Sequence, residues 1–387
     1  MQVDAIDLFY AAMPNVTLAA DGSQDALIVR VSAGGYVGWG ECEASPLVSI
    51  AAFITPRSHG VCQPVAISVI GEQLDSPADI HRISAAVRRN SMDVLQAAHT
   101  FSGIEMALWD VLGHARGEPV WKLLGYDKNY PKTPYASLLF GDTPEETLTR
   151  GQEWTAKGFQ AVKFGWGPFG RDLASDADQL HAAREAIGDA RLMVDAGQVW
   201  EGNFEAAASR LPLLADAGVT WLEEPFEADA YEQYAALAKL SGTVGIAGGE
   251  ASHTSGMATN LIRYGGIRFV QIDSGRVGGL APSKLVADFA NSAGVTYVNH
   301  TFTSHLALSA SLQPFAGLRD SVLCEYPASP SSLGAAIATA PLAITENGEI
   351  SAPDAPGLGV CVDLEALDPY LQTVDILVNG KQLFQSP

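Results

Sequence analysis

From residue 132 to residue 344, short apolar runs alternate with stretches of amphipathic helical periodicity. A short apolar run predicts a strand buried on both faces, and a helical stretch after it predicts the connection to the next parallel strand. The helices are expected at Pro144–Lys157, Asp176–Ile187, Phe204–Ala217, Ala230–Leu240, Thr254–Tyr264, Ala281–Ala293 and Ser304–Ala316. The alternation indicates strand–helix units around a parallel sheet, which is an α/β fold.

Seven polar residues each close one of the apolar runs. They are Lys163, Asp195, Glu223, Glu250, Asp273, His300 and Glu325. The intervals between them, about 23 to about 32 residues, are close to the ~31 residues per unit of a barrel with eight strand–helix repeats. Since such a barrel directs the carboxyl ends of all its strands at one mouth, these side chains are expected to meet there, which indicates an enzyme.

The chain on either side of this region has a different pattern. Before it, Ala26–Ser32 alternates like a strand, Gly34–Gly40 predicts a turn into another strand, and Ala78–Arg89 and Gly103–Gly113 have helical periodicity. After it, a segment rich in proline and glycine leads to a strand-like run at Val374–Val378. We therefore predict an α+β domain at residues 1–130, a barrel at 131–350, and a segment at 351–387 that returns to the first domain.

Composition limits the partners of the chain. Of its 387 residues, 47% are apolar, and the net charge is −21. So acidic a surface disfavours nucleic acid and anionic membranes, and an anionic substrate would need local positive charge such as a metal ion. No apolar stretch approaches the ~20 residues of a membrane span, and the N-terminus lacks the basic flank of a signal peptide. The four cysteines include no pair spaced closely enough for a zinc site or a redox motif. A cytoplasmic protein is expected.

Asp195, Glu223 and Glu250 are carboxylates on three consecutive predicted strands. Each one alone is explained as well by a cap of the helix that follows, because an acidic side chain stabilises a helix N-terminus. Three that point at one place would repel each other strongly unless a cation lay between them. Hard divalent cations such as Mg²⁺ take oxygen ligands, so the three together favour a metal site.

Asp273 and His300 are expected on the next two strands. A carboxylate beside an imidazole fixes its tautomer and raises its basicity, so His300 is the candidate general base and Asp273 the residue that orients it. Lys163 would place a fixed positive charge across the barrel. Glu325, if protonated, would donate a hydrogen bond.

Several segments resemble the enolase superfamily and, within it, the mandelate racemase subgroup. The similar segments are Val194–Trp200 (VDAGQVW), Trp221–Pro225 (WLEEP), Ala247–Glu250 (AGGE), Asp273 followed by Val277–Gly279 (VGG), Ile104–Gly125 and Pro356–Gly359. The resemblance covers nearly the whole chain. It implies a modified TIM (β/α) barrel with an α+β N-terminal capping domain that the C-terminal tail completes.

The resemblance also implies essential Mg²⁺ and a small-molecule substrate with a carboxylate. On the matching positions, the metal ligands would be Asp195, Glu223 and Glu250. The base would be the His300–Asp273 dyad, and Glu325 would hydrogen-bond the substrate carboxylate. Members of the family commonly assemble into dimers and octamers, so a homo-oligomer is expected.

One position departs from the family pattern. The second barrel strand usually ends in Lys-x-Lys, whose second lysine is a base on one face of the substrate, but here it reads Lys163-Phe164-Gly165. Racemisation needs a group on each face, whereas β-elimination needs one if the same group takes the proton and then protonates the leaving hydroxide. We therefore predict a Mg²⁺-dependent dehydratase of a sugar acid, an aldonate or aldarate, that forms a 2-keto-3-deoxy acid by syn elimination at His300.

Other functions stay open. A cycloisomerase or lactone-converting enzyme would use the same base with a different leaving group, and an epimerase would need Lys163 or another group on the second face. A barrel that binds a metal and a ligand without catalysis belongs to a different class. Specificity is expected from the loops at 13–25 and 44–59, where Arg57 is a candidate for the distal carboxylate of a diacid. His253 is a candidate second acid.

Overall fold

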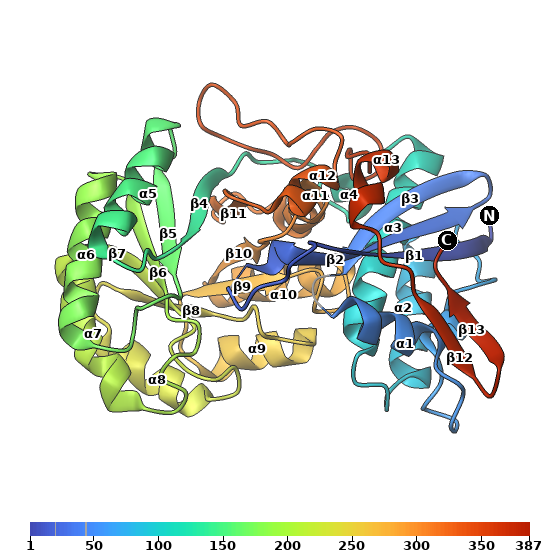
Figure 1. Cartoon of the computed structure of the whole chain (residues 1–387), viewed down its shortest axis with the longest axis horizontal. Coiled ribbons are helices and arrows are strands. Elements are labelled where there is room, and N and C mark those ends of the chain that lie inside the picture. The colour runs from blue at the N-terminus through green and yellow to red at the C-terminus, as the bar shows by residue number, and fades with distance from the viewer. Residues whose placement is uncertain (20, 43–44) are drawn as a thin grey trace.

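The computed structural model of the chain describes residues 1–19, 21–42 and 45–387 (Figure 1). Residues 20 and 44, which belong to the two loops expected to set specificity, lie outside the described residues. None of the helices in the described part of the chain is both long enough and apolar enough to cross a membrane.

A parallel sheet of eight strands, ordered β10-β9-β8-β7-β6-β5-β4-β11, forms the larger part of the molecule. The strands are β4 (Thr133–Leu139), β5 (Ala161–Gly165), β6 (Arg191–Asp195), β7 (Val219–Glu223), β8 (Gly245–Gly248), β9 (Phe269–Asp273), β10 (Thr296–His300) and β11 (Leu323–Pro327). The helices between them are α5 (Pro144–Ala156), α6 (Leu173–Ile187), α7 (Phe204–Asp216), α8 (Tyr231–Leu240), α9 (Ser255–Tyr264), α10 (Leu280–Ala293) and α11 (His305–Leu312). Helices cover the outside of the curved sheet (Figure 1), so the predicted alternation is confirmed.

A side chain bridges the first and last strands in this order. Asn299, in β10, donates from Nδ2 to the backbone oxygen of Glu325 in β11 at 3.2 Å, and its Oδ1 accepts from the backbone N–H of Glu325 at 2.9 Å. The amide side chain thus takes the place of a backbone partner where the sheet closes on itself. This closure holds the ends of β10 and β11, and with them His300 and Glu325, side by side.

The N-terminal part of the chain forms a separate α+β layer. An antiparallel sheet of β1 (Val3–Ala12), β2 (Asp25–Ala33) and β3 (Tyr36–Cys42) packs on α3 (Ala97–Arg116). The other helices of this part are α1 (Pro46–Ile54), α2 (Pro77–Asn90) and α4 (Val120–Leu123). A Cβ at Gly38 or Gly40 would lie 2.4 or 2.0 Å from a backbone oxygen of α3, so these two glycines permit the close packing.

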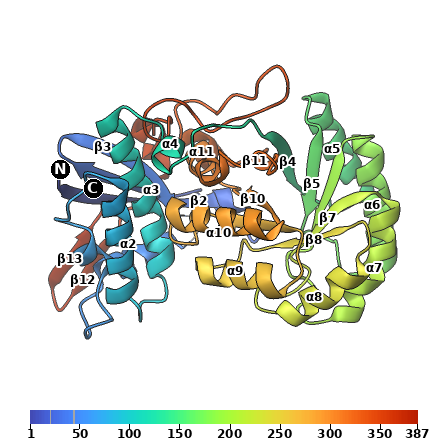
Figure 2. The same ribbon diagram turned by 180° about the vertical axis from the view of Figure 1, so that it is seen from behind.

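The C-terminal tail returns to this layer, as Figure 1 and the reverse view in Figure 2 show. The N–H of Gln372 donates to the backbone oxygen of Tyr10 at 2.7 Å, and the hairpin of β12 (Asp375–Val378) and β13 (Lys381–Gln385) follows. The predicted fold class, a modified (β/α) barrel with an α+β capping domain completed by the tail, is therefore confirmed. Strand β1 was not predicted from the sequence, because exposed Asp4 and half-buried Asp7 interrupt its apolar pattern.

Candidate active site

A cavity of about 390 Å³ lies at the carboxyl ends of the barrel strands. Five of the seven predicted side chains line it: Lys163, Asp195, Glu250, His300 and Glu325. Glu223 and Asp273 contact members of this group directly. The structure therefore brings all seven together.

The strand period of two explains why these side chains reach the mouth. Residues two positions earlier on a strand face the same way, towards the barrel axis. Ala161, Met193, Trp221, Val298 and Leu323 lie two residues before Lys163, Asp195, Glu223, His300 and Glu325, and they pack together as one buried cluster. These apolar side chains thus form the floor of the site, and the polar side chains lie in the next layer, towards the mouth of the barrel.

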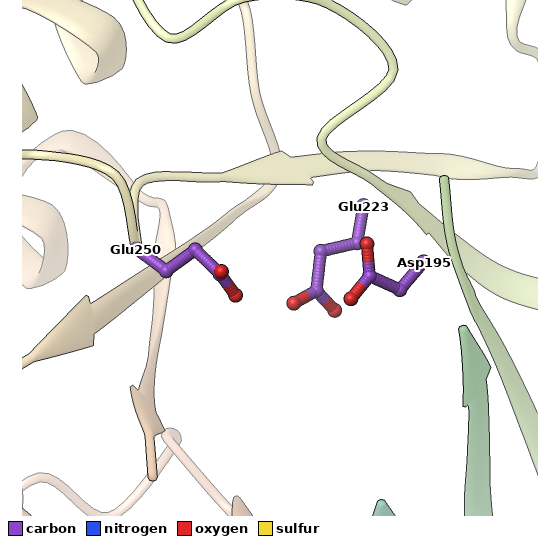
Figure 3. A group of neighbouring side chains, drawn as sticks. All are labelled: Asp195, Glu223 and Glu250. Carbon is purple, nitrogen blue, oxygen red and sulfur yellow. The ribbon is translucent and has the colours of Figure 1, made fainter. Parts of the chain in front are cut away.

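Asp195 and Glu223 are the last residues of β6 and β7, and Glu250 follows β8 by two residues. One carboxylate oxygen from each lies within 4.8 Å of the others. Figure 3 shows the three carboxyl groups directed at a common space. Burial and the neighbouring carboxylates raise the pKa of Asp195 well above its usual value. Three buried oxygen donors that destabilise each other's charge fit a hard divalent cation.

The alternative, that these acids cap the following helices, is wrong. Asn203 caps α7 by accepting from the N–H of Ala206, and Thr254 caps α9 by accepting from the N–H of Met257. The residue before α8 is Ala230, which makes no side-chain cap. Two of the three helix starts are thus capped by other residues and the third by no side chain, and the three carboxylates are directed at the cavity.

Lys163 lies between acidic groups. Its Nζ is 2.9 Å from Oε1 of Glu223, 2.8 Å from Oε1 of Glu325 and 3.8 Å from Oδ2 of Asp195. Burial alone would lower the pKa of Lys163, but Glu223 and Glu325 raise it well above its usual value. The side chain is thus a fixed positive charge rather than a proton donor or acceptor.

The neighbours of Glu325 favour its ionised form. Its Oε2 accepts a hydrogen bond of 2.8 Å from the N–H of Thr301, and its Oε1 pairs with Lys163. Burial would raise the pKa of Glu325, but the Lys163 ammonium and His300 together lower it below its usual value. Donation of a hydrogen bond by Glu325 would require a proton that Lys163 disfavours.

His300 and Asp273 form a hydrogen-bonded pair at the ends of β10 and β9. Nδ1 of His300 lies 2.7 Å from Oδ2 of Asp273, whose other oxygen accepts from the N–H of Gly275 at 2.6 Å. Nε2 of His300 lies 3.1 Å from Oε2 of Glu250. Burial disfavours a charged imidazole, but nearby carboxylates, Glu250 first among them, raise the pKa of His300 to about 10. Asp273 therefore fixes the ring so that Nε2 faces the carboxylates.

Gly165 explains the missing second lysine. A Cβ at this position would lie 2.9 Å from Cβ of Asp195 and 3.2 Å from its Oδ2. Any side chain at residue 165 would therefore displace Asp195. The next residue, Trp166, lines the cavity and is 42% exposed.

Several residues at this site were not identified from the sequence. Arg276 lines the cavity, with Nη1 at 3.5 Å from Oε1 of Glu250. Glu224 is buried with a φ of 41°, and its Oε2 accepts from Nε2 of Gln198 at 2.8 Å. Burial and Glu250 raise the pKa of Glu224 to about 7. The position of Arg276, three residues after the strand end at Asp273, is the one signal that the sequence offered.

Two candidates from the sequence lie elsewhere. Arg57 and His253 are exposed, and neither is among the described residues that line the cavity. The ring of His253 lies 5.1 Å from the ring of His99, at the surface. Among the described residues that line the cavity, the arginine is Arg276 rather than Arg57.

Two family models match the chain. "Mandelate racemase / muconate lactonizing enzyme, N-terminal domain" matches residues 10–125, and "Enolase C-terminal domain-like" matches residues 146–367. The chain belongs to the enolase superfamily, in its mandelate racemase subgroup. A crystal structure of a predicted mandelate racemase from Rhodobacter sphaeroides is 59% identical, covers 100% of this chain and 99% of its own, and has a TM-score of 0.96.

Several relatives with assigned activities are named for reactions of sugar acids or their lactones. The 3,6-anhydro-alpha-L-galactonate cycloisomerase of Streptomyces coelicolor is 34% identical over 70% of this chain and 72% of its own length. The D-galactarolactone cycloisomerase of Agrobacterium fabrum is 29% identical over 87% and 88%. The arabinonate dehydratase of Saccharolobus solfataricus is 27% identical over 87% of each chain.

Proposed function

We propose that this member of the enolase superfamily removes the α-proton of a sugar acid and eliminates an oxygen substituent from the β-carbon, with Mg²⁺ as cofactor. The observation that carries the proposal is the one-sided arrangement of bases. The His300–Asp273 dyad faces the carboxylates from one wall, while Asp195 occupies the space in which a side chain of residue 165 would lie.

Asp195, Glu223 and Glu250 would hold the ion. When bound, Mg²⁺ would offset the charge of the three carboxylates and supply positive charge beside the substrate carboxylate. Lys163 adds a second positive charge that needs no proton movement, because its pKa lies far above neutrality. Negative charge develops on the substrate carboxylate as the α-proton leaves. Fixed positive groups of this kind stabilise that charge by about 3 kcal/mol.

His300 performs both proton transfers. The carboxylate that does most to raise the pKa of His300 is Glu250, whose charge a bound ion would offset, so the imidazole would then be neutral. Nε2 takes the α-proton while Asp273 holds Nδ1 and stabilises the imidazolium that forms. The same Nε2–H then donates to the departing β-oxygen on the same face, which is a syn elimination. With a hydroxyl leaving group, water is lost and the enol product tautomerises to a 2-keto-3-deoxy acid, so the enzyme is a hydro-lyase.

Ring opening is a second candidate for the same site. The β-oxygen would then belong to a ring, and its expulsion by His300 would isomerise the substrate without loss of water. The apolar side chains on the cavity wall, among them Leu138, Leu139 and Trp166, favour this candidate, as do the cycloisomerases among the relatives. Epimerisation is disfavoured, because residue 165, the position of the second lysine, is a glycine and offers no group for the other face of the substrate.

The test is His300→Asn in a screen of sugar acids with Mg²⁺ in D₂O. The wild-type enzyme is expected to exchange the α-proton and form a 2-keto product, and the variant to lose both while it still binds Mg²⁺. A 2-keto product with the mass of the substrate minus water identifies dehydration, and a 2-keto product of unchanged mass identifies ring opening. Turnover retained by the variant would refute the role of His300, and absence of exchange with every acid would favour a non-catalytic binding protein.

A further inference from the structure

The geometry points to Trp166 as a specificity-determining residue that stacks on a ring of the substrate, so that the site takes a cyclic sugar acid in preference to an open-chain one. The inference rests on the proposed function and concerns the part of the substrate beyond the reacting carbons. Trp166 lines the same cavity as His300 and Asp195, directly after Gly165 at the end of β5.

The indole of Trp166 is held in place by an unusual backbone. The φ of Trp166 is 56°, in the left-handed region that bulky residues rarely adopt. The backbone N–H of Trp166 donates to the backbone oxygen of Asp195 at 3.2 Å. Gly197 also has a left-handed φ, 54°, and a Cβ there would lie 2.7 Å from the indole. The ring therefore packs directly on the backbone of the metal-ligand loop, and a disfavoured conformation of this kind at a cavity points to a function.

The other tryptophans nearby show what a structural indole looks like in this chain. Trp221 is fully buried, and its Nε1 donates to Oε2 of Glu223 at 2.9 Å. Trp200 is 6% exposed, and its Nε1 donates to the backbone oxygen of Gly170 at 2.8 Å. Trp166, at 42% exposure, instead presents aromatic surface to the cavity.

The surroundings of Trp166 select the chemistry of the ligand. Leu138, Leu139 and Phe302 line the same cavity and offer no hydrogen bonds from their side chains. Hydroxyl groups that lie against these three side chains would lose their water without a replacement, which is unfavourable. The hydrogen bonds of a sugar acid would have to come from the polar side chains of the same cavity, among them Asp21, Ser137 and Arg276. A ring presents a face of C–H groups, which an aromatic face attracts through its negative quadrupole. The carboxylate end of such a ligand would lie at Lys163 and the metal ligands.

The experiment measures binding without turnover. His300→Asn protein with Mg²⁺ is titrated with two matched pairs, 3,6-anhydrogalactonate against galactonate and galactarolactone against galactarate. A ring compound from at least one pair is expected to bind about tenfold more tightly than its open-chain partner. Adding Trp166→Ala should remove that preference by weakening only the ring compound, and Trp166→Phe should restore part of it.

Two controls keep the outcomes apart. The Mg²⁺ affinity of the Trp166 variants should equal that of the parent, which shows that Asp195 is still in place. The inference is overturned if Trp166→Ala weakens the binding of ring and open-chain compounds equally, or weakens neither. It is also overturned if the parent protein prefers the ring compound in neither pair. The experiment measures binding and not turnover. If the protein prefers ring compounds but exchanges no α-proton, the proposed function is wrong and the inference about Trp166 still holds.

Discussion

Oε2 of Glu105, in α3, accepts a hydrogen bond of 2.6 Å from the backbone N–H of Leu280, the first residue of α10. The other oxygen of Glu105 accepts from the N–H of Ala281 at 3.0 Å, so one carboxylate of the capping domain serves the start of a barrel helix. Gly279 makes this possible, because a Cβ there would lie 2.1 Å from Oε2 of Glu105. The contact ties the capping domain to the loop that follows Asp273.

Gly279→Ala is expected to lower the free energy of unfolding by at least about 2 kcal/mol, because the methyl group would collide with Glu105 at a φ of 107°. Urea denaturation measures the loss. Gly278→Ala is the matched control, since its φ is 105° but its Cβ would meet only Cγ of Pro282 at 3.4 Å. Equal losses in the two variants would mean that backbone strain, and not the contact with Glu105, decides the effect.

Mg²⁺ should stabilise the folded protein through the three carboxylates. At a concentration of one hundred times Kd, a ligand that binds only the folded state adds about 2.7 kcal/mol. Asp195→Asn, Glu223→Gln and Glu250→Gln are each expected to abolish the rise in Tm that Mg²⁺ causes in the wild type, and Asp216→Asn, an exposed acid, to retain it. In metal-free buffer Asp195→Asn should not lower Tm, because it removes a buried charge that its neighbours destabilise. A rise in Tm that persists in all three variants would contradict the metal site.

Gly165→Ala should weaken Mg²⁺ binding about tenfold, because the new methyl group pushes Asp195 away from Glu223 and Glu250. Isothermal titration with Mg²⁺ measures the change. Gly151→Ala is the control, since its Cβ would lie 2.6 Å from Cβ of Ala186, between two outer helices, and its destabilisation should leave Mg²⁺ affinity unchanged. Unaltered affinity in Gly165→Ala would show that Asp195 can move without cost.

The sequence predicted the barrel well because the pattern that it carries is local. Each strand is a short apolar run, and each helix has its own periodicity, so neither depends on contacts that are distant in the chain. The positions of five of the seven site residues, each with an apolar residue two places before it, follow from the same strand period, as at Asp195 and Met193. Two helix bounds were placed several residues too late. Helix α6 begins at Leu173 rather than Asp176, and α11 stops at Leu312, before Pro314, rather than at Ala316.

What the sequence did not predict depends on backbone geometry and tertiary contacts. Trp166 and Glu224, both with a left-handed φ, place an aromatic side chain at the cavity and a buried carboxyl group near Glu250, from segments that carry no periodic pattern. The absence of a side chain at Gly165 predicted a wall without a base, but the reason for it, the closeness of Asp195, is visible only in three dimensions. The ionised state of Glu325 likewise depends on Lys163, which lies far from it in the chain.

Lys132 should give the stability of the fold a pH dependence of its own. It is 1% exposed, and Nζ donates to the backbone oxygen of Leu318 at 2.7 Å. Burial lowers the pKa of Lys132 from 10.5 to about 8. Between these two values the unfolded chain binds more protons than the folded one, so rising pH favours the folded state by up to about 1.4 kcal/mol per pH unit.

Lys132→Met removes this titration while it keeps an apolar stem beside Phe315. The free energy of unfolding of the wild type, minus that of the variant, is therefore expected to increase from pH 8 to pH 10, and to be constant below pH 7. Urea unfolding at matched pH values measures the difference, and other groups that titrate contribute equally to both proteins. A difference that stays constant up to pH 10 would mean that the hydrogen bond to Leu318 and the ring of Phe315 keep the ammonium charged inside the fold.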